Sequence, residues 1–286
     1  MKMNPIDTMI KRVQAEQKVV SIYANPEQPD ASIVGYIHRA SYDDVLIRHL
    51  TPEGKQDGYV LQRISDIFQL DVDGDYEQRL ALLYDLQNQQ HEQLDVEQDL
   101  LSEILYYALE NDEVVTLYTN PDDPSGAVAG YIHAFTDEHV LMRHITREGR
   151  EDGYVVRRVE DIFHLGILGE YENGLDCLYR MQEQEHIYFF QVLKDNKPDL
   201  LRNVLLQAKL KGWILRMGLE DEERGDVIGQ IQQSDGEHVT VRRIDEWGHE
   251  DGYTIIFVGD LVKLNIHGEE ERSRETLLAY QQEKGI

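Results

Sequence analysis

Apolar and polar residues alternate along the chain in a way that predicts a helix followed by five short strands. Near the start, Ile6, Ile10 and Val13 recur at the spacing of one helical face. An apolar run over residues 19–23 predicts the first strand, and a turn rich in Pro and Asp leads to the second. Residues 239–242 alternate between apolar and polar, which is the period of a half-buried strand. The pattern favours an α+β protein that is mainly β.

The triplet Asp-Gly-Tyr occurs three times and marks a threefold internal repeat. Its copies are offset by 152 − 57 = 95 and 251 − 152 = 99 residues, and the same offsets align other positions. We predict matching blocks at about 19–68, 114–163 and 213–262, aligned without a gap. The repeat signature consists of Asp57, Gly58, Tyr59, Asp152, Gly153, Tyr154, Asp251, Gly252 and Tyr253, of Gly35, Gly130 and Gly229, and of Arg48, Arg143 and Arg242.

Two parts of this signature have structural interpretations. The glycine of the second strand indicates a bend or a close backbone approach, where a side chain does not fit. The Asp-Gly pair is expected to shape a hairpin turn, and the tyrosine is expected to begin the fourth strand.

Helical connectors separate the repeats. Tyr76, Leu80, Leu83 and Tyr84 share one helical face, and each connector leads into the first helix of the next repeat. We therefore expect a helical hairpin between successive repeats. The predicted domains are repeat 1 over 1–74, a connector over 75–97, repeat 2 over 98–169, a connector over 170–198, repeat 3 over 199–268 and a C-terminal helix over 269–286.

A helix followed by five strongly bent strands resembles the Sm-like (Hfq-like) small β-barrel family. The resemblance is carried by Val19-Val20-Ser21-Ile22-Tyr23, Val34-Gly35-Tyr36-Ile37, the third strand from Val45 to Leu50, and Ile64-Ser65-Asp66-Ile67. It covers the three repeated blocks and none of the connectors. The resemblance implies three tandem Sm-like five-stranded bent-sheet barrels, each with an N-terminal helix, joined by helical-hairpin connectors. A small barrel of other ancestry is the alternative.

The residues with which this family binds RNA do not recur here. Where the family places an asparagine that recognises a base, this chain has Leu46, Leu141 and Thr240. The stretch that contacts uridine in Hfq-like proteins lacks aromatic and basic groups in two of the three repeats. We expect the RNA site of the family to be lost.

Arginines are the main candidates for binding chemistry. One arginine of the third strand recurs in each repeat, and these three either form an anion site or, as we favour, pair with acidic groups of their own repeat. The arginines are Arg48, Arg143 and Arg242, and the expected acidic partners are Asp66, Asp161 and Asp260. Possible anion or partner contacts in the second repeat are Arg143, Arg147, Arg150, Arg157 and Arg158. Interleaved acidic residues favour local neutralisation over a basic patch.

No pattern typical of an active site or a metal centre is found. The histidines lack the spacing that places two ligands on one helical face. Asp71, Asp73 and Asp75 do not complete a calcium-binding loop, and Cys177 lies beside apolar helix residues, which favours a packed thiol. We predict no catalytic residues, no metal and no cofactor.

The charge narrows the class of partner. The 286 residues include 28 basic and 55 acidic side chains, a net charge of −27, which disfavours binding to nucleic acid or to an anionic membrane. A single cysteine and the absence of a long apolar run or an apolar start fit a soluble cytoplasmic protein.

Two function classes remain. The first is a non-enzymatic cytoplasmic scaffold or regulator that binds a protein partner through repeated Sm-like barrels. The alternative is a diverged Sm-like RNA-binding post-transcriptional regulator that uses the arginines of the second repeat. The partner could also be a second copy, because Sm-like proteins join the fourth strand of one unit to the fifth strand of the next. Two chains could then form a homodimeric pseudo-hexameric ring, unless the helical connectors cover the edges and leave a monomer.

Overall fold

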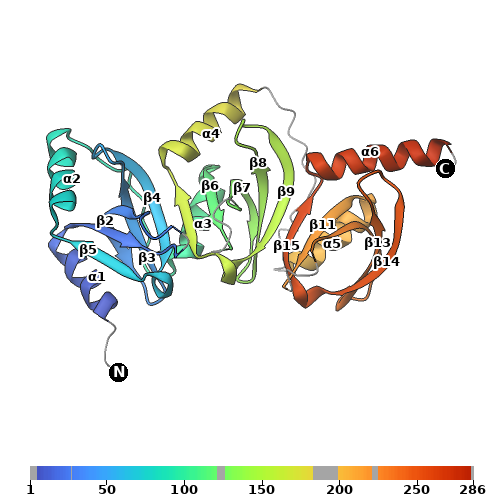
Figure 1. Ribbon diagram of the computed structural model, residues 1–286, viewed down its shortest axis with the longest axis horizontal. Helices are drawn as coiled ribbons and strands as arrows, with labels where there is room; N and C mark the ends of the chain where they lie inside the picture. The colour runs from blue at the N-terminus through green and yellow to red at the C-terminus, as the bar shows by residue number, and fades with distance from the viewer. Residues whose placement is uncertain (1–4, 27, 121–125, 183–198, 221–224, 285–286) are drawn as a thin grey trace. The chain divides into compact units, whose positions relative to one another are not determined.

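A computed structural model describes residues 5–26, 28–120, 126–182, 199–220 and 225–284, and the same succession of elements occurs three times (Figure 1). Repeat 1 contains α1 (Pro5–Glu16), β1 (Val19–Tyr23), β2 (Ile33–Ala40), β3 (Asp44–Leu50), β4 (Gln56–Arg63), η1 (Ile64–Asp66), β5 (Gln69–Val72) and α2 (Asp75–Leu86). Repeat 2 contains α3 (Leu100–Asn111), β6 (Val114–Tyr118), β7 (Val128–Phe135), β8 (His139–Ile145), β9 (Glu151–Arg158), η2 (Val159–Asp161), β10 (His164–Ile167) and α4 (Glu170–Met181). Repeat 3 contains α5 (Leu200–Lys211), β11 (Ile214–Leu219), β12 (Val227–Ser234), β13 (His238–Ile244), β14 (Glu250–Phe257), η4 (Val258–Asp260), β15 (Leu261–Ile266) and α6 (Glu269–Lys284).

The strands form one sheet in the order β14-β13-β12-β11-β15-β9-β8-β7-β6-β10-β4-β3-β2-β1-β5. In each repeat the first strand pairs antiparallel with both the second and the fifth strand. The fifth strand of a later repeat pairs on its other side with the fourth strand of the repeat before it. Thus β10 lies between β6 and β4, and β15 lies between β11 and β9.

The expectation of three closed Sm-like barrels is therefore wrong, and the Sm-like (Hfq-like) identification that implied it is not supported. A five-stranded barrel closes only when the two outermost strands of its own block pair with each other. In the described chain, the outer strands of each block instead bond to a neighbouring block or lie at the end of the sheet. Over the described residues, the product is a long, open antiparallel sheet with six α-helices.

The first connector is not a helical hairpin either. Helix α2 ends at Leu86, and residues 87–99 cross the sheet of repeat 1 without helical structure before α3 begins. In this segment, Leu94 and Val96 are buried. The backbone oxygen of Glu92 accepts a hydrogen bond from the hydroxyl of Tyr59, and that of Leu94 is hydrogen-bonded to His38 Nε2. The alternation of buried and exposed residues explains why this stretch is extended. The corresponding part of the second connector lies outside the described residues.

The chain divides into two compact units, Met1–Tyr131 with Asp161–Cys177 and Ile132–Glu160 with Leu178–Ile286. The boundary passes through repeat 2, because β10 bonds to β4 of repeat 1 while β9 bonds to β15 of repeat 3. Each unit thus contains one complete pairing of a fourth strand with the fifth strand of the following repeat.

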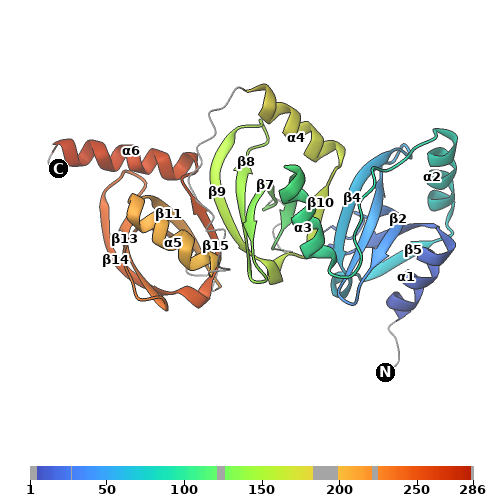
Figure 2. The same cartoon turned by 180° about the vertical axis from the view of Figure 1, so that it is seen from behind.

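Each unit has its own apolar core under a helix. In the first unit, Ile10 and Val13 of α1 are buried against β1–β3, which confirms the helical face expected from the sequence. In the second unit, α5 lies across the strands of repeat 3 (Figure 2), and Leu201 and Leu205 join the core around Leu215. Within the described residues, no helix is long and apolar enough to cross a membrane.

The glycine of the second strand occupies a position of close backbone approach, as expected. A Cβ atom added to Gly35 would lie 2.0 Å from the carbonyl oxygen of Arg48 on the neighbouring strand. At Gly229 the corresponding distance is 2.1 Å, to the carbonyl oxygen of Arg242. Only glycine fits at these two positions.

The Asp-Gly-Tyr triplet does not form a turn, contrary to expectation. The hairpin turn before β4 contains Gly54 with φ 73°, whereas Asp57-Gly58-Tyr59 lies inside β4. Gly58 has φ 63°, and the pairing of β3 with β4 changes register between Arg48 and Leu50. The triplet therefore marks a β-bulge that requires glycine.

The repeat alignment contains one gap. The first and second strands begin 128 − 114 = 14 residues apart in repeat 2 but 227 − 214 = 13 residues apart in repeat 3. Leu215 of repeat 3 is therefore equivalent to Val115 of repeat 2, because Leu215 pairs with Gly229 and Val115 pairs with Gly130. The gapless alignment is therefore wrong by one residue in the first strand of repeat 3.

We predict that Gly35→Ala lowers the free energy of unfolding by about 2 kcal/mol or more, because the new methyl group overlaps the Arg48 carbonyl. Urea titration of the full chain measures this loss. The matched control is Gly174→Ala in α4, where an added Cβ meets nothing within 4 Å. Replacing glycine inside a helix should there be neutral or stabilising by up to about 1 kcal/mol. Equal effects in the two variants would contradict the close approach.

Candidate functional site

The pairing of a fourth strand with the fifth strand of the following repeat is the most regular feature of the molecule, and we call it the inter-repeat joint. The first joint consists of β4 and β10, and the second of β9 and β15. Their registers are equivalent, since Tyr59 faces Ile167 in the first and Tyr154 faces Ile266 in the second. The tyrosine of the Asp-Gly-Tyr triplet therefore lies within the joint in both cases.

The glycine of the triplet allows the two backbones to meet. A Cβ atom at Gly58 would lie 2.3 Å from the carbonyl oxygen of Ile167. At Gly153 the distance to the carbonyl oxygen of Ile266 would be 2.2 Å. Both glycines also have positive φ, so a side chain is excluded by strain as well as by contact.

The aspartate of the triplet caps a helix of the following repeat. Asp57 Oδ1 accepts a hydrogen bond from the backbone N–H of Glu170, the first residue of α4, at 2.7 Å. Asp152 Oδ1 accepts one from the N–H of Glu269, the first residue of α6, at 2.5 Å. A carboxylate at this place satisfies an unpaired N–H and interacts favourably with the helix dipole.

A histidine orients each of these carboxylates. His49 Nδ1 lies 3.1 Å from Asp57 Oδ2, and His144 Nδ1 lies 3.4 Å from Asp152 Oδ2. The hydrogen bond with histidine is the main cause that lowers the pKa of each aspartate, and the backbone N–H of the capped helix adds to it. Both aspartates are consequently charged acceptors, so each histidine–aspartate pair has a structural role in its joint.

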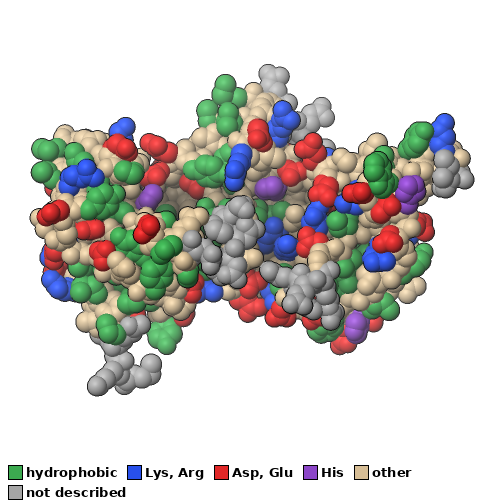
Figure 3. Space-filling model, in the orientation of Figure 1, with side chains coloured by type: hydrophobic (Ala, Val, Ile, Leu, Met, Phe, Trp, Pro, Cys, Tyr) green, Lys and Arg blue, Asp and Glu red, His purple; other side chains and the backbone are tan. Residues whose placement is uncertain are grey.

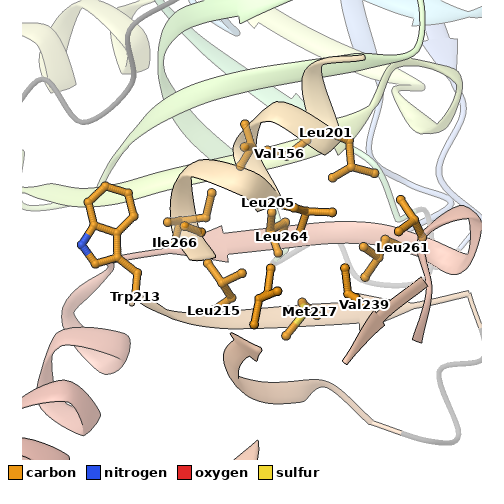
Figure 4. Close-up of a cluster of buried hydrophobic side chains, with 14 of the residues drawn as sticks. Val156, Leu201, Leu205, Trp213, Leu215, Met217, Val239, Leu261, Leu264 and Ile266 are labelled. Carbon is orange, nitrogen blue, oxygen red and sulfur yellow. The ribbon is translucent and has the colours of Figure 1, made fainter. Parts of the chain in front are cut away.

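Large side chains on the fourth strand become buried at the joints. Tyr59 and Leu61 are 3 % and 2 % exposed, and Tyr154 and Val156 are 1 % and 2 % exposed. Figure 4 shows Val156 of β9 among side chains of repeat 3, including Leu201. The second joint therefore combines backbone hydrogen bonds with an apolar core that continues from β9 into repeat 3.

Two of the five candidate arginines belong to the second joint. Arg157 is 8 % exposed and donates hydrogen bonds to Asn265 Oδ1 and to the carbonyl oxygen of Leu264. Arg158 donates from Nε to the carbonyl oxygen of Leu261 at 2.9 Å. Arg63 has a similar role in the first joint, where its guanidinium donates to the carbonyl oxygen of Ile162 at 2.7 Å. These guanidinium groups bind the following repeat.

The other three candidate arginines lie elsewhere on repeat 2. Arg147 and Arg150 are exposed in the hairpin between β8 and β9, and Arg143 stacks over the ring of Tyr179. On the face seen in Figure 3, basic side chains lie scattered among acidic ones. The structure therefore does not gather the five arginines into one site.

In repeat 3 the recurring arginine of the third strand pairs with an acidic group of its own repeat, as expected, but the partner is Glu250 and not Asp260. Arg48 stacks over Tyr36 and donates to Gln17 Oε1 at 2.8 Å. Arg242 forms an ion pair with Glu250 at the start of β14. The acidic partner of Arg242 thus comes from the adjacent strand, and aromatic stacking is the contact common to Arg48 and Arg143.

The third Asp-Gly-Tyr triplet lies in β14, at one end of the sheet. Here Tyr253 is 64 % exposed and Ile255 is 69 % exposed, and Phe257 is also exposed. Asp251 contacts Arg243 of its own repeat, with Nη2 3.2 Å from Oδ2. The residues that form a joint in repeats 1 and 2 are therefore present in repeat 3 with their apolar side chains facing solvent.

A cavity of about 670 Å³ lies beside the second joint. Its lining includes Asp137, Glu138, Glu160 and Glu237, together with Arg158, which already donates to Leu261. This acidic lining suits a cationic group better than an anion. Within the described residues, no group of three or more His, Cys, Asp or Glu side chains is arranged to hold a metal ion.

Comparison of the chain with protein families, with curated proteins and with solved structures finds no match. The candidate site therefore rests on the geometry of the joints and of the end strands. Sequence analysis identified the triplet but assigned it to a turn. The signal for a buried strand was the apolar run Tyr59-Val60-Leu61, repeated as Tyr154-Val155-Val156 and Tyr253-Thr254-Ile255-Ile256, because adjacent apolar residues indicate a strand that is covered on both faces.

We predict that Gly58→Ala destabilises the protein by about 2 kcal/mol or more, because positive φ and contact with Ile167 both disfavour a methyl group. The matched control is Gly212→Ala, which has φ 67° and nothing within 4 Å of an added Cβ. It should cost only about 1 kcal/mol from backbone strain. Urea unfolding of both variants separates the two contributions, and an equal loss would show that the joint does not need the contact.

Acid should weaken the first joint through His164. Its Nδ1 lies 3.1 Å from Gln62 Oε1 of β4, and burial lowers the pKa of His164 from 6.5 to about 4. The unfolded chain therefore takes up a proton at this residue as the pH falls below about 6.5, while the folded joint does not until about pH 4. Stability is lost across that window.

We predict that His164→Gln, which removes this titration, flattens the fall in unfolding free energy between pH 6.5 and 4 relative to the unmodified chain. Urea titrations at several pH values measure the difference between the two slopes. Parallel slopes would contradict the role of His164.

Proposed function

We propose that the protein is a non-enzymatic cytoplasmic scaffold or regulator that binds a protein partner by strand addition to the edge of its sheet. The observation that carries the proposal is β14, whose Tyr253 and Ile255 are 64 % and 69 % exposed although their counterparts are buried in β4 and β9, the strands that pair with a following fifth strand. An exposed apolar edge of this kind marks an interaction surface.

The chemistry of this edge favours a polypeptide as the ligand. Along the free side of β14, backbone N–H and C=O groups recur at the spacing of a second strand, and alternate side chains supply apolar contacts. The pairing of β4 and β9 with a strand from another repeat supports this mode of binding. A cytoplasmic setting is supported by the composition, which includes one cysteine.

RNA binding receives less support from the same structure. The arginines proposed for it include Arg157 and Arg158, whose guanidinium groups donate to the backbone and to Asn265 of repeat 3. The net charge of −27 also repels a phosphate backbone. In the part of the chain that the structure describes, the histidine–aspartate pairs of the joints orient helix caps, which supports a structural role for them over a catalytic one.

A strand added in trans tests the proposal. The probe is a labelled peptide of residues 163–172, which contains β10 and the start of α4, and the protein is immobilised at low density so that chains do not meet. We predict binding of this peptide, and loss of binding when alternate backbone nitrogens of the peptide are methylated to remove N–H donors.

The site on the protein is tested with two alanine variants. Gly252→Ala places a methyl group where a paired strand must approach and should weaken binding by about tenfold or more. Gly212→Ala, which has similar positive φ but lies at the end of α5, should bind as the unmodified chain does. Failure of the peptide to bind, or equal binding of its methylated form, would rule out strand addition at β14.

A further inference from the structure

The two end strands of the sheet are the two unused halves of an inter-repeat joint. Strand β14 is the fourth strand of repeat 3, and β5 is the fifth strand of repeat 1. In the first and second joints these two kinds of strand pair with each other. We infer that β14 of one chain pairs with β5 of a second copy, forming a third joint of the same design. This inference rests on the proposed strand addition and specifies its partner.

The β14 half contains the space that a partner strand would fill. Gly252 has φ 76°, like Gly58 and Gly153, yet the nearest atom to an added Cβ is the guanidinium nitrogen of Arg243 at 3.8 Å. In the formed joints that space holds backbone atoms of the following repeat within 2.3 Å. Strand β14 therefore retains a glycine whose close contact is not supplied by β13, its neighbour in the sheet.

The β5 half already has the conformation of a formed joint. Asp73, directly after β5, has φ 63°, close to the 61° of Leu168 and the 55° of His267 at the same position in the other repeats. Positive φ is costly for residues other than glycine, so its recurrence indicates a common backbone path. Because this path exists before any partner binds, little ordering is required on association.

The cap that an aspartate supplies to α4 and α6 is missing at α2. Gly74, the N-cap of α2, has no side-chain hydrogen bond to the helix. At the equivalent glycine before α4, a Cβ atom added to Gly169 would lie 3.1 Å from Asp57 Oδ1, the oxygen that caps the helix. Before α6, a Cβ atom added to Gly268 would lie 3.0 Å from Asp152 Oδ1. In the inferred joint, Asp251 of the second copy takes this place and accepts from the N–H of Asp75.

The register of the formed joints determines which residues meet. Transferred by the repeat offsets, it places Tyr253 opposite Val72, Thr254 opposite Asp71, Ile255 opposite Leu70 and Ile256 opposite Gln69. The pairs of Tyr253 and Ile255 are apolar, and the hydroxyl of Thr254 can donate to the Asp71 carboxylate. The two edges are complementary at these three pairs, and the fourth pair places Ile256 opposite Gln69.

One residue of the edge differs from the earlier repeats. Phe257 occupies the place of Arg63 and Arg158, whose guanidinium groups donate to the backbone of the following repeat. On the opposite half, Phe68, which directly precedes β5, is 46 % exposed. In the inferred joint an aromatic contact between these two rings replaces the arginine hydrogen bond.

Oligomeric state gives the first test. Head-to-tail joints either close between two copies or continue into longer assemblies, and both consume the two edges. Light scattering of the full chain at physiological ionic strength and tens of micromolar protein should give twice the 33.3 kDa chain mass or a larger multiple. Because each chain carries −27, low salt should shift the equilibrium toward monomer. A monomer at both ionic strengths overturns the inference.

Matched glycine variants show whether β14 forms the contact. Gly252→Ala should weaken association by about tenfold or more, and Gly212→Ala should leave it unchanged. Because an alanine at position 252 meets no close atom within its own chain, loss of assembly is expected without loss of the folded state. Equal association of both variants overturns the inference.

Cysteine cross-linking tests the register, with Cys177→Ser as background. One chain carries Thr254→Cys and another carries Asp71→Cys, so that a disulfide between them requires β14 of one copy opposite β5 of the other. The mixture should form a cross-linked pair rapidly. A mixture of Thr254→Cys with Gln69→Cys, two residues out of register, should cross-link far more slowly. Equal rates in the two mixtures overturn the inferred joint.

These outcomes separate self-association from the proposed function. If the chain is monomeric but the peptide of residues 163–172 still binds in a manner that depends on Gly252, strand addition stands and the second copy is ruled out as the partner. If neither assembly nor peptide binding occurs, both conclusions fail.

Discussion

Backbone pairing between a fourth strand and the fifth strand of the following repeat is the interaction on which the architecture depends. Without β10, the backbone N–H and C=O groups on the outer side of β4 would be left unpaired. With it, three five-stranded blocks become one sheet, and each block obtains part of its core from its neighbour. A repeat of this kind is stable mainly as a member of an array.

The Asp-Gly-Tyr triplet combines three requirements of this pairing in adjacent residues. Gly58 admits the neighbouring backbone, Tyr59 adds apolar area, and Asp57 caps the helix that follows the added strand. The three effects act on the same few atoms, so a substitution at one position disturbs the others. This explains why the triplet recurs as a unit, whereas the fourth-strand residues that follow it vary among repeats.

Sequence reasoning could identify what is local and could not identify what joins distant segments. The helical face of Ile10 and Val13 and the close approach at Gly35 follow from periodicity and from the properties of glycine. The continuation of the sheet from one repeat to the next depends on which strands pair with β4 and β9. These pairings join residues about 100 positions apart, and no local pattern encodes them. The arginines were misleading for the same reason: Arg157 pairs with Asn265, a partner that becomes visible only with the pairing of β9 and β15.

The two end strands, β14 and β5, differ from the strands that usually end a repeat array. Terminal repeats usually carry a polar outer face, since an exposed strand edge promotes unwanted association. Here β14 retains Gly252 with positive φ and exposes Tyr253 and Ile255, and β5 retains the backbone conformation at Asp73 that follows a paired fifth strand. The glycine and the exposed apolar side chains bring no packing to an isolated repeat 3, and the positive φ of Asp73 adds strain to repeat 1. Their presence at both ends is accounted for in the inferred assembly, where each edge has a partner strand.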